Sequence, residues 1–370
     1  MAVAGVILAG GRSSRMGGGD KPLLPLRHRT VLGHVVGRAR PQVATLALNA
    51  NDDPARFAAY GLPVIADTLD GLQGPLAGIL AALDWAQGVG GVDRVATFTG
   101  DSPFVPRDLV ARLVAAVDGQ RPTYASSLSG QHPVFAVWPL SARDALAAFL
   151  AEQPSRRLMD AMRHLGAIEV AFDGTGLTDP FFNINTPEDL AAAELAATRT
   201  SLDPVLGIAG WKNAGKTTMT ERLVAELSRR GHRVSTVKHA HHDADIDRPG
   251  TDTYRHRTAG AAEVALVTGR RWALMHESRG EEDPGLDEVL ARLSPCDIVL
   301  VEGYRRAPIP KIELRRGQAR DSERLAASDP MVLAVAADAP QDGETLPVFD
   351  LDDVAAIADF IVDRMALTAG

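Results

Sequence analysis

Two glycine-rich segments of different kinds could each hold phosphate groups. The first is Leu8-Ala-Gly-Gly-Arg-Ser-Ser-Arg-Met-Gly-Gly-Gly-Asp-Lys21, and the second is Gly210-Trp-Lys-Asn-Ala-Gly-Lys-Thr217. Glycine lets the backbone turn its amide groups toward an anion, and nearby lysine or arginine adds positive charge locally. Each segment follows a short apolar run that predicts a strand. The sequence therefore predicts two nucleotide sites on one chain.

The first segment adds three basic residues, Arg12, Arg15 and Lys21, to its glycines. A bare Gly-Gly-Arg is also typical of a flexible tight turn. The ordered spacing through to Asp20 and Lys21 favours a polyphosphate cradle instead. This cradle needs no basic surface elsewhere on the chain.

Asp101 is the candidate metal ligand of the first half. It follows the apolar run 95–99, and ligands of open α/β sheets bind beyond the carboxyl ends of strands. A lone aspartate at such a place is more often a turn residue. Paired with the first segment it becomes a suitable magnesium ligand, because Mg²⁺ prefers one or two carboxylates together with phosphate oxygens.

The second segment has the Walker A pattern after a predicted strand and at the start of a predicted helix. Backbone amides and the helix N-terminus hold phosphate in this pattern, its lysine reaches the outer phosphates, and its threonine binds magnesium. Glu302, at the end of another predicted strand, is a second candidate for the metal. The expected nucleotide-binding residues are Gly210, Asn213, Ala214, Gly215, Lys216, Thr217 and Thr218.

A polar segment from His239 to Asp247 contains three histidines and three aspartates. Such residues could bind a metal ion. Their spacing matches no standard zinc pattern, so we favour a polar switch or ligand loop without a permanent ion.

Composition indicates a two-domain cytoplasmic enzyme. The chain has 370 residues, of which 45% are hydrophobic and 23% charged, with a net charge of -8. The negative charge argues against a nucleic-acid partner. The single cysteine, Cys296, excludes an internal disulfide, fits a reducing compartment and is expected to be buried. The first apolar run is too short for a membrane span and predicts a strand, so no membrane partner is expected.

The elements that must position these residues alternate between strands and helices, which predicts a sheet sandwiched by helices. In the first half we predict strands at 3–9, 43–48, 63–66, 95–99, 134–137 and 168–172, and helices at 76–85, 108–117 and 143–150. Thr186, Pro187 and Glu188 predict the start of a further helix. In the second half we predict strands at 205–209, 234–238, 264–268, 298–302 and 332–336, and helices at 216–230 and 352–365.

Residues 1–197 resemble the molybdenum cofactor guanylyltransferases, the MobA type. The resemblance rests on the first segment, Gly74-Pro-Leu-Ala-Gly78, Gly100-Asp-Ser-Pro103 and Asn183-Ile-Asn-Thr-Pro-Glu-Asp189. It implies a Rossmann-like three-layer nucleotidyltransferase sandwich that passes the guanylyl group of GTP to the terminal phosphate of molybdopterin cofactor. The implied nucleotide contacts are Leu8, Ala9, Gly10, Gly11, Lys21, Asn49, Asp67 and Asp101, with Asn51 a near neighbour of Asn49.

That reaction assigns roles to the candidate residues. Asp101 would hold Mg²⁺, while Lys21 and Arg15 would stabilise the charge on leaving pyrophosphate. The acceptor cofactor would be held by His132, Asn183 and Asn185, which could equally serve only as a strand turn and a helix entry.

Residues 205–370 resemble the molybdopterin-guanine dinucleotide biosynthesis adapter, the MobB type. The resemblance uses the second segment, the polar segment, Thr258-Ala-Gly-Ala261 and Glu302-Gly-Tyr304. It implies a P-loop NTPase-like α/β domain that binds GTP and assists the transferase, joined by a linker at 198–204. Proteins that mature molybdoenzymes, and a second copy of the chain meeting through this half, are further expected partners.

Other readings stay open at this point. The first half could use CTP with the same cofactor, or a sugar phosphate with another nucleotide, because phosphate-loop chemistry does not select a base. The second half could be a regulatory GTP-binding module or a metallochaperone. The second half could also be a kinase. Its sequence argues against this, because it has no separate acceptor-phosphate signature and no obvious lid.

Overall fold

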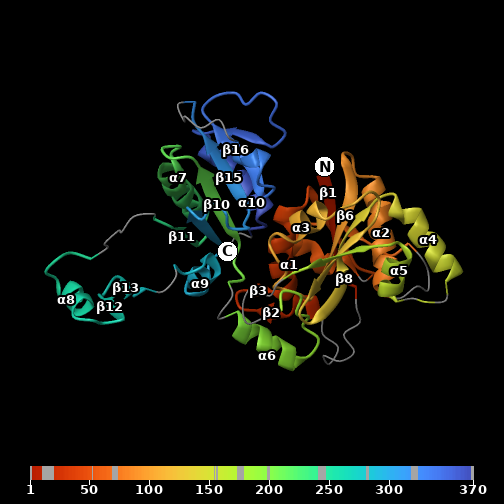
Figure 1. Ribbon diagram of the computed structural model, residues 1–370, viewed down its shortest axis with the longest axis horizontal. Helices are drawn as coiled ribbons and strands as arrows, with labels where there is room; N and C mark the ends of the chain where they lie inside the picture. Colours follow the sequence, from red (N-terminus) through yellow and green to blue (C-terminus); the bar gives the residue numbers. More distant parts are fainter. Residues whose placement is uncertain are drawn as a thin grey trace.

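The computed structural model describes residues 2–10, 21–51, 53–68, 74–153, 155, 157–172, 179–197, 201–240, 247–280, 283–317 and 324–367. In these ranges the chain forms two α/β units, each built around its own sheet (Figure 1). We call the unit that carries the seven-stranded sheet the N-terminal domain. The unit that carries the six-stranded sheet is the C-terminal domain.

The N-terminal sheet is mixed, with strand order β5-β4-β1-β6-β8-β7-β9. Its strands β5, β4, β1 and β6 run parallel, whereas β8 is antiparallel to both β6 and β7. Because β7 is parallel to β9, β8 is the one strand of this sheet that runs against the others. The strands are β1 Ala2–Leu8, β4 Thr45–Asn49, β5 Val64–Ile65, β6 Val92–Thr99, β7 Thr123–Ser127, β8 Gly130–Pro139 and β9 Ile168–Ala171.

Helices cover both faces of this sheet and make a three-layer sandwich. Alternate residues of β1 enter opposite cores: Val3 and Ile7 pack with α1 and α3, whereas Ala4 and Val6 pack with α2, α4 and α5. The three-layer prediction is therefore confirmed. The helices are α1 Val31–Ala39, α2 Pro75–Gln87, α3 Leu109–Ala115, α4 Ala142–Glu152, α5 Leu158–His164 and α6 Pro187–Ala196.

Short elements complete the N-terminal domain. They are the hairpin of β2 Pro25–Leu26 and β3 Arg29–Thr30, and the 3-10 helices η1 Lys21–Leu23, η2 Arg40–Gln42 and η3 Pro54–Tyr60. The predicted start of α6 is confirmed, because the Thr186 side chain accepts from the Asp189 N–H and the Asp189 side chain accepts from the Thr186 N–H.

The C-terminal sheet has the order β11-β14-β10-β15-β16-β17, and its paired strands run parallel. One face packs on α7 and α10, and the other on α9. The elements are β10 Val205–Gly210, α7 Lys216–Arg229, β11 Val234–Lys238, α9 Leu286–Ala291, β14 Ile298–Glu302, β15 Lys311–Arg315, η4 Leu325–Ala327, β16 Val332–Ala337, β17 Val348–Asp350 and α10 Val354–Arg364.

A separate hairpin lies apart from the C-terminal sheet, beside α8 Asp252–Thr258 (Figure 1). Its strands are β12 Glu263–Val267 and β13 Trp272–His276, which pair only with each other among the described strands. The strand predicted at 264–268 therefore exists, but it belongs to this hairpin and not to the main sheet.

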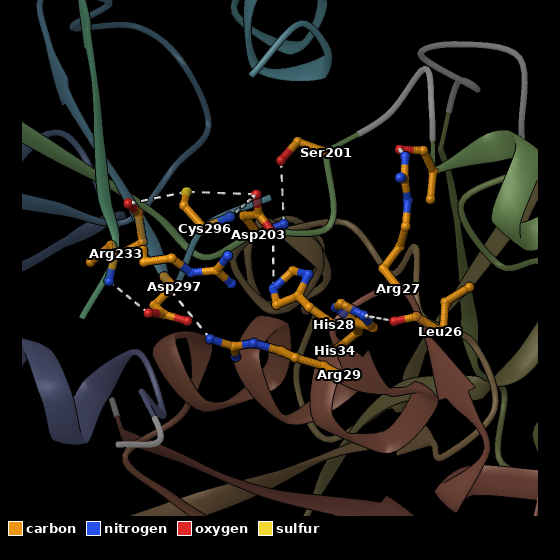
Figure 2. Close-up of polar contacts among 12 residues, drawn as sticks. Leu26, Arg27, His28, Arg29, His34, Ser201, Asp203, Arg233, Cys296 and Asp297 are labelled. Carbon is orange, nitrogen blue, oxygen red and sulfur yellow. Dashed lines mark hydrogen bonds and ion pairs between the residues drawn. The ribbon is translucent and has the colours of Figure 1, made fainter. Parts of the chain in front are cut away.

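Polar contacts join the two domains next to the segment that connects their sheets (Figure 2). His28 Nε2 lies 3.3 Å from Asp203 Oδ1, and Arg29 Nη2 donates to the Asp297 carbonyl at 3.2 Å. The other Asp203 oxygen accepts from the Cys296 N–H at 3.2 Å. Cys296 is buried, as predicted, and burial raises the pKa of its thiol to about 11. This thiol is therefore protonated at neutral pH.

None of the helices in the described ranges has the length and apolar character to cross a bilayer.

Candidate functional site

The first candidate site lies where β1, β4 and β6 end at one edge of the N-terminal sheet. Leu8 is in register with Asn49 on one side and with Thr99 on the other. The chain leaving β1 stays attached to both neighbours, because the Ala9 N–H donates to the Asn49 carbonyl at 2.9 Å and the Gly100 N–H donates to the Leu8 carbonyl at 3.0 Å. The predicted nucleotide contacts therefore gather at the carboxyl ends of parallel strands, where such folds bind ligands.

A polar network fixes one wall of this site. Asn49 Nδ2 donates to Asp67 Oδ1 at 2.9 Å, and Asn51 Nδ2 donates to Asp67 Oδ2 at 2.8 Å. Asn49 is buried and Asn51 is exposed. Gly78 of α2 lies against the Asn49 side chain, so that any Cβ at position 78 would collide with it. This close approach is a physical reason for the second glycine of the Gly-Pro-Leu-Ala-Gly motif.

Asp101 follows β6 and is largely buried. Its Oδ1 atom has no hydrogen-bond partner among the described residues. Burial raises the pKa of this carboxyl, although the Thr99 hydroxyl and the positive charge of Lys21 act in the opposite direction. A buried carboxylate oxygen without a partner is costly unless a cation or donor satisfies it. The carboxyl of Asp101 therefore fits the role of a magnesium ligand.

The Asn183-Ile-Asn185 segment lies beside the predicted nucleotide contacts Lys21 and Asp101. Lys21 Nζ donates to Asn185 Oδ1 at 3.0 Å, and the Ser102 hydroxyl donates to Asn183 Oδ1. The Ile184 N–H donates to the Asp101 carbonyl at 3.0 Å. The structure therefore brings Lys21 and Asp101 together with two of the three predicted acceptor residues.

Ser102 was missed as a site residue by the sequence reasoning. Its hydroxyl joins Thr99, at 2.8 Å, to Asn183. Its position directly after Asp101 in the Gly-Asp-Ser-Pro motif was the available signal.

His132 occupies a neighbouring but separate cluster. Its Nε2 atom lies 2.8 Å from the Ser127 hydroxyl, which in turn donates to Asp179 Oδ2 at 2.6 Å. The His132 ring packs on Phe181 with centroids 4.6 Å apart. Burial lowers the pKa of His132, with Asp179 opposing that shift. Among the described residues, His132 has no hydrogen bond or ion pair with Asn183.

Residues 11–20 of the first glycine-rich segment lie outside the described residues. They include Gly11, Arg12, Arg15 and Asp20. Leu8, Ala9 and Gly10 precede this gap at the end of β1, and Lys21 opens η1 after it.

The second candidate site is the loop between β10 and α7. Gly210 and Gly215 have φ angles of 148° and 90°, in the region that only glycine adopts without strain. Lys216 Nζ donates to the carbonyls of Gly210 at 3.0 Å and Trp211 at 2.7 Å. Burial lowers the pKa of Lys216, while Glu302 raises it. The lysine is therefore held over the loop that would carry the phosphates.

The predicted magnesium residues of the second site are in contact. The Thr217 hydroxyl donates to Glu302 Oε1 at 2.8 Å, because β10 and β14 are adjacent parallel strands. Lys238 at the end of β11 joins them, with Nζ 3.3 Å from Thr217 Oγ1 and 3.4 Å from Glu302 Oε1. Asn213 has a φ angle of 68°, Ala214 is buried and Thr218 is exposed. The sequence reasoning missed Lys238, although it directly precedes the polar segment.

Residues 241–246 of the polar segment lie outside the described residues. At its start, the His239 ring packs on Tyr304 with centroids 4.6 Å apart, and its Nε2 lies 3.8 Å from Asp283. At its end, Asp247 accepts from Thr251 and Thr253. Within the described ranges, no group of three acidic, histidine or cysteine side chains is placed to hold a metal.

Comparisons with known proteins identify a family for each half of the chain. The MobA-like NTP transferase domain matches residues 5–166, and molybdopterin guanine dinucleotide synthesis protein B, MobB, matches residues 205–338. The molybdenum cofactor guanylyltransferase of Mesorhizobium japonicum is 51% identical over 205 residues, which are 54% of this chain and 98% of that protein. The molybdenum cofactor guanylyltransferase of a Bradyrhizobium strain is 47% identical over 199 residues, 53% of this chain and 93% of that protein.

A solved MobB homologue from Bacillus stearothermophilus is 29% identical and covers 44% of this chain and 99% of that structure, with a TM-score of 0.34. The two family matches follow each other without overlap, in the order that the resemblance implied. The chain belongs to the molybdenum cofactor guanylyltransferase family and carries a MobB domain after its MobA-like NTP transferase domain.

Proposed function

We propose that the N-terminal domain transfers GMP from GTP to the terminal phosphate of molybdopterin cofactor, yielding the guanine dinucleotide cofactor and pyrophosphate. The observation that carries this proposal is the meeting of Lys21 and Asp101 with the Asn183-Ile-Asn185 segment at one sheet edge. A nucleotide side and an acceptor side are thereby joined in a single site. The relatives named above are guanylyltransferases. This favours GTP over CTP as the nucleotide, and molybdopterin cofactor over a sugar phosphate as the acceptor.

The chemistry requires position and charge more than proton transfer. A phosphate monoester is already nucleophilic near neutral pH, so one of its oxygens attacks the α-phosphorus of GTP, and the bond to the β-phosphate oxygen breaks. Lys21 and Arg15 stabilise the charge that develops on pyrophosphate. Asp101 would hold Mg²⁺, which when bound would neutralise charge on the nucleotide phosphates. Asn49 and Asp67 support the nucleotide wall through their mutual hydrogen bond.

The acceptor residues have distinct positions in this proposal. Asn183 accepts a hydrogen bond from Ser102, and Asn185 accepts one from Lys21. In this proposal both asparagines therefore orient the attacking phosphate. His132 lies in the separate cluster with Ser127 and Asp179 and would contact a more distant part of the cofactor.

The C-terminal domain is proposed to bind GTP as an accessory to the transferase. Lys216, Thr217 and Glu302 form a Walker-type arrangement that fits a nucleotide with magnesium. We keep the boundaries 1–197, 198–204 and 205–370 for the two domains and their linker. The covalent connection raises the effective concentration of one site near the other. A free thiol at Cys296 supports a location in the reducing cytoplasm.

A homodimer through the C-terminal domain is a further part of the proposal. The β12 and β13 hairpin exposes Val267 and Trp272, which are 74% and 69% accessible. An exposed apolar hairpin with unpaired strand edges can pair with an identical hairpin through a twofold axis. Light scattering after size exclusion tests this arrangement: Trp272→Ser should shift the chain from dimer toward monomer, and a wild-type monomer at micromolar concentration would contradict it.

The experiment for the proposed reaction is a pyrophosphate-release assay on the full chain with magnesium and molybdopterin cofactor. Each of the four nucleoside triphosphates is supplied in turn. Release that requires both GTP and the cofactor is the expected result. A preference for CTP, or release that does not depend on the cofactor, would contradict the proposal.

A further inference from the structure

A cavity of about 1490 Å³ lies between the two domains. Arg38, Arg107 and Phe172 are among the residues that line its N-terminal wall, and Trp211 and Lys216 are on the opposite wall. Small-molecule sites commonly occupy roughly 300–1,000 Å³. The cavity therefore has room for a ligand of nucleotide size in addition to phosphates held by the second loop.

The N-terminal wall carries the buried guanidinium group of Arg38 and the largely buried one of Arg107, whose side chain is 11% exposed. Arg38 donates to the carbonyls of Val105 at 2.9 Å and Ser201 at 2.7 Å, and no carboxylate lies within ion-pair distance of it among the described residues. Its Nε atom also has no hydrogen-bond partner in those residues. Arg107 donates to the Asp203 carbonyl at 3.0 Å, and its Nη1 atom lies 3.9 Å from the Asp287 carboxylate. Burial lowers the pKa of both arginines. Buried charges of this kind are stabilised by an anion.

Positive charge exceeds negative charge among the described residues that line the cavity. Seven arginine and lysine side chains line it against four aspartate and glutamate side chains, an excess of three. Three of the four carboxylates also lie near a basic group: Asp287 lies near Arg107, Asp283 lies 3.8 Å from His239, and Glu302 lies 3.4 Å from Lys238. The remaining charge therefore favours an anionic ligand.

Each wall also presents a guanidinium plane that rests on an aromatic ring. Arg112 lies over Phe172 at 4.0 Å from the ring centroid, and Arg305 lies over Trp211 at 4.2 Å. One pair belongs to each domain, and all four residues line the cavity. A guanidinium supported on one face can stack its other face on a planar heterocycle and offer its N–H groups to phosphate.

The cavity continues from the outer-phosphate end of the second loop. Lys216 and Glu302, the residues that would meet the outer phosphates and their metal, both line it. The space beyond them extends to the N-terminal domain. A ligand in that space would therefore face the outer phosphates of the nucleotide and would also contact Arg112.

We infer that the interdomain cavity is a binding site for a second ligand, a phosphate ester of a planar heterocycle, and that both domains form it. Arg38 and Arg107 supply the charge that attracts its phosphate. Arg112 and Arg305 supply stacking planes for its ring. A purine phosphate and a pterin phosphate share this chemistry, and the experiment distinguishes them.

Contacts between the domains hold the two walls in place. Arg38 donates to the Ser201 carbonyl and Arg107 to the Asp203 carbonyl, both in the linker. His28 also contacts Asp203 (Figure 2). Arg29 adds a contact to Asp297 in the C-terminal domain. The cavity is therefore part of the folded chain before any ligand arrives.

The test uses the full chain saturated with magnesium and a non-hydrolysable GTP analogue, so that both glycine-rich loops are occupied. GMP and 6-hydroxymethylpterin phosphate are titrated separately as probes. Trp211 emission is the readout, taken as the difference between each protein and its Trp211→Phe counterpart. Because Trp211 lines the cavity, ligands at the first candidate site contribute little to this difference.

At least one probe should give a saturable change, with binding weakened about tenfold in both Arg112→Ala and Arg305→Ala. Arg121→Ala is the matched control, since Arg121 is exposed and does not line the cavity. Arg305 is exposed, so its substitution leaves the fold intact. Stronger binding of GMP would identify a purine phosphate, and stronger binding of the other probe a pterin phosphate.

Three results would overturn the inference. The first is the absence of a saturable change with either probe. The second is equal binding of the probes by Arg112→Ala, Arg305→Ala and Arg121→Ala. The third is weaker binding in Arg305→Ala alone, which would show that the N-terminal domain does not form part of the site. Guanylyl transfer is measured separately with the wild-type and Arg121→Ala chains, which should both carry it out. A failure of the cavity site is thereby distinguished from a failure of the proposed reaction.

Discussion

Lys21 and Asn185 are joined by a hydrogen bond of 3.0 Å from the Lys21 ammonium to the Asn185 side-chain carbonyl, although 164 positions separate them in the sequence. The lysine ends the first glycine-rich segment, and the asparagine precedes the cap of α6. The contact connects the residue proposed to stabilise pyrophosphate with a residue proposed to orient the acceptor. In the proposed reaction, Lys21 therefore contacts both the leaving pyrophosphate and a residue that orients the acceptor.

Removal of this contact should impair transfer more than folding. Asn185→Ala leaves Lys21 without its partner and lets the ammonium move from its catalytic position. We expect kcat/KM for GTP to fall by about tenfold, since a charged hydrogen bond contributes about 1.5 to 3 kcal/mol. Steady-state pyrophosphate release checks this, with the thermal midpoint measured on the same sample. A normal kcat/KM would remove Asn185 from the site.

Asp101→Asn should abolish transfer and stabilise the fold in the absence of metal. Burial raises the pKa of Asp101, so the folded state holds its proton more tightly than the unfolded state. The contribution of this group to stability is therefore present below its unfolded pKa and is lost as pH rises through its folded pKa. At neutral pH the charged carboxylate destabilises the metal-free fold, and the neutral amide removes that cost.

Two measurements check the Asp101 prediction. Thermal unfolding at pH 7 without divalent metal should give a higher midpoint for Asp101→Asn than for the wild-type chain. The same variant should lose at least about a hundredfold in kcat, because one fixed electrostatic contact at the reacting phosphates is worth that much. Transfer at the wild-type rate would exclude Asp101 as the metal ligand.

Gly78→Ala should disturb the nucleotide wall through Asn49. A Cβ at position 78 would collide with the Asn49 side chain, whose amide holds Asp67. We expect a loss of about 1 to 3 kcal/mol in the free energy of unfolding and a higher KM for GTP. Gly90→Ala is the control, because open space surrounds Gly90. Equal KM values for the two variants would separate Asn49 from nucleotide binding.

His34 should make the N-terminal domain acid-sensitive. Burial lowers its pKa to about 3, whereas the unfolded histidine titrates near 6.5. Below that unfolded pKa the unfolded chain takes up a proton that the folded chain refuses, so stability falls as pH falls. The expected loss is about 2 kcal/mol between pH 6.5 and pH 5.

Chemical unfolding at several pH values checks the His34 prediction. His34→Gln can still donate to the Leu26 carbonyl, which now accepts from His34 Nε2 at 2.9 Å, but it does not titrate. The slope of stability against pH should be shallower in this variant. Identical slopes would show that other groups dominate the acid response.

The sequence predicted the strands and helices with strong periodicity but not the way the sheets are assembled. The strands at 234–238 and 298–302 match β11 and β14 in both limits, and the helix at 216–230 is α7 with one residue fewer. The helix predicted at 352–365 starts only at Val354, because Asp353 caps it. Strand β7, Thr123–Ser127, was missed because it holds serines and lacks a clear apolar alternation.

Only those parts of the candidate site that depend on local sequence patterns could be predicted. Glycine-rich loops and strand-end carboxylates are local patterns, so Leu8, Asp101, Lys216 and Thr217 could be selected from the sequence. The pairing of Lys21 with Asn185 depends on a contact between distant segments, and no local pattern reports it. The interdomain cavity likewise depends on the packing of two domains, which neither half encodes alone.

The most direct test of the account is chromatographic detection of the guanine dinucleotide cofactor formed by the full chain. Wild type, Asp101→Asn and Lys216→Ala are each supplied with GTP, magnesium and molybdopterin cofactor. Product is expected from the wild type and from Lys216→Ala, because the second loop is accessory, and none from Asp101→Asn. Product from Asp101→Asn at the wild-type rate, or its complete loss in Lys216→Ala alone, would contradict the assignment of the reaction to the N-terminal domain.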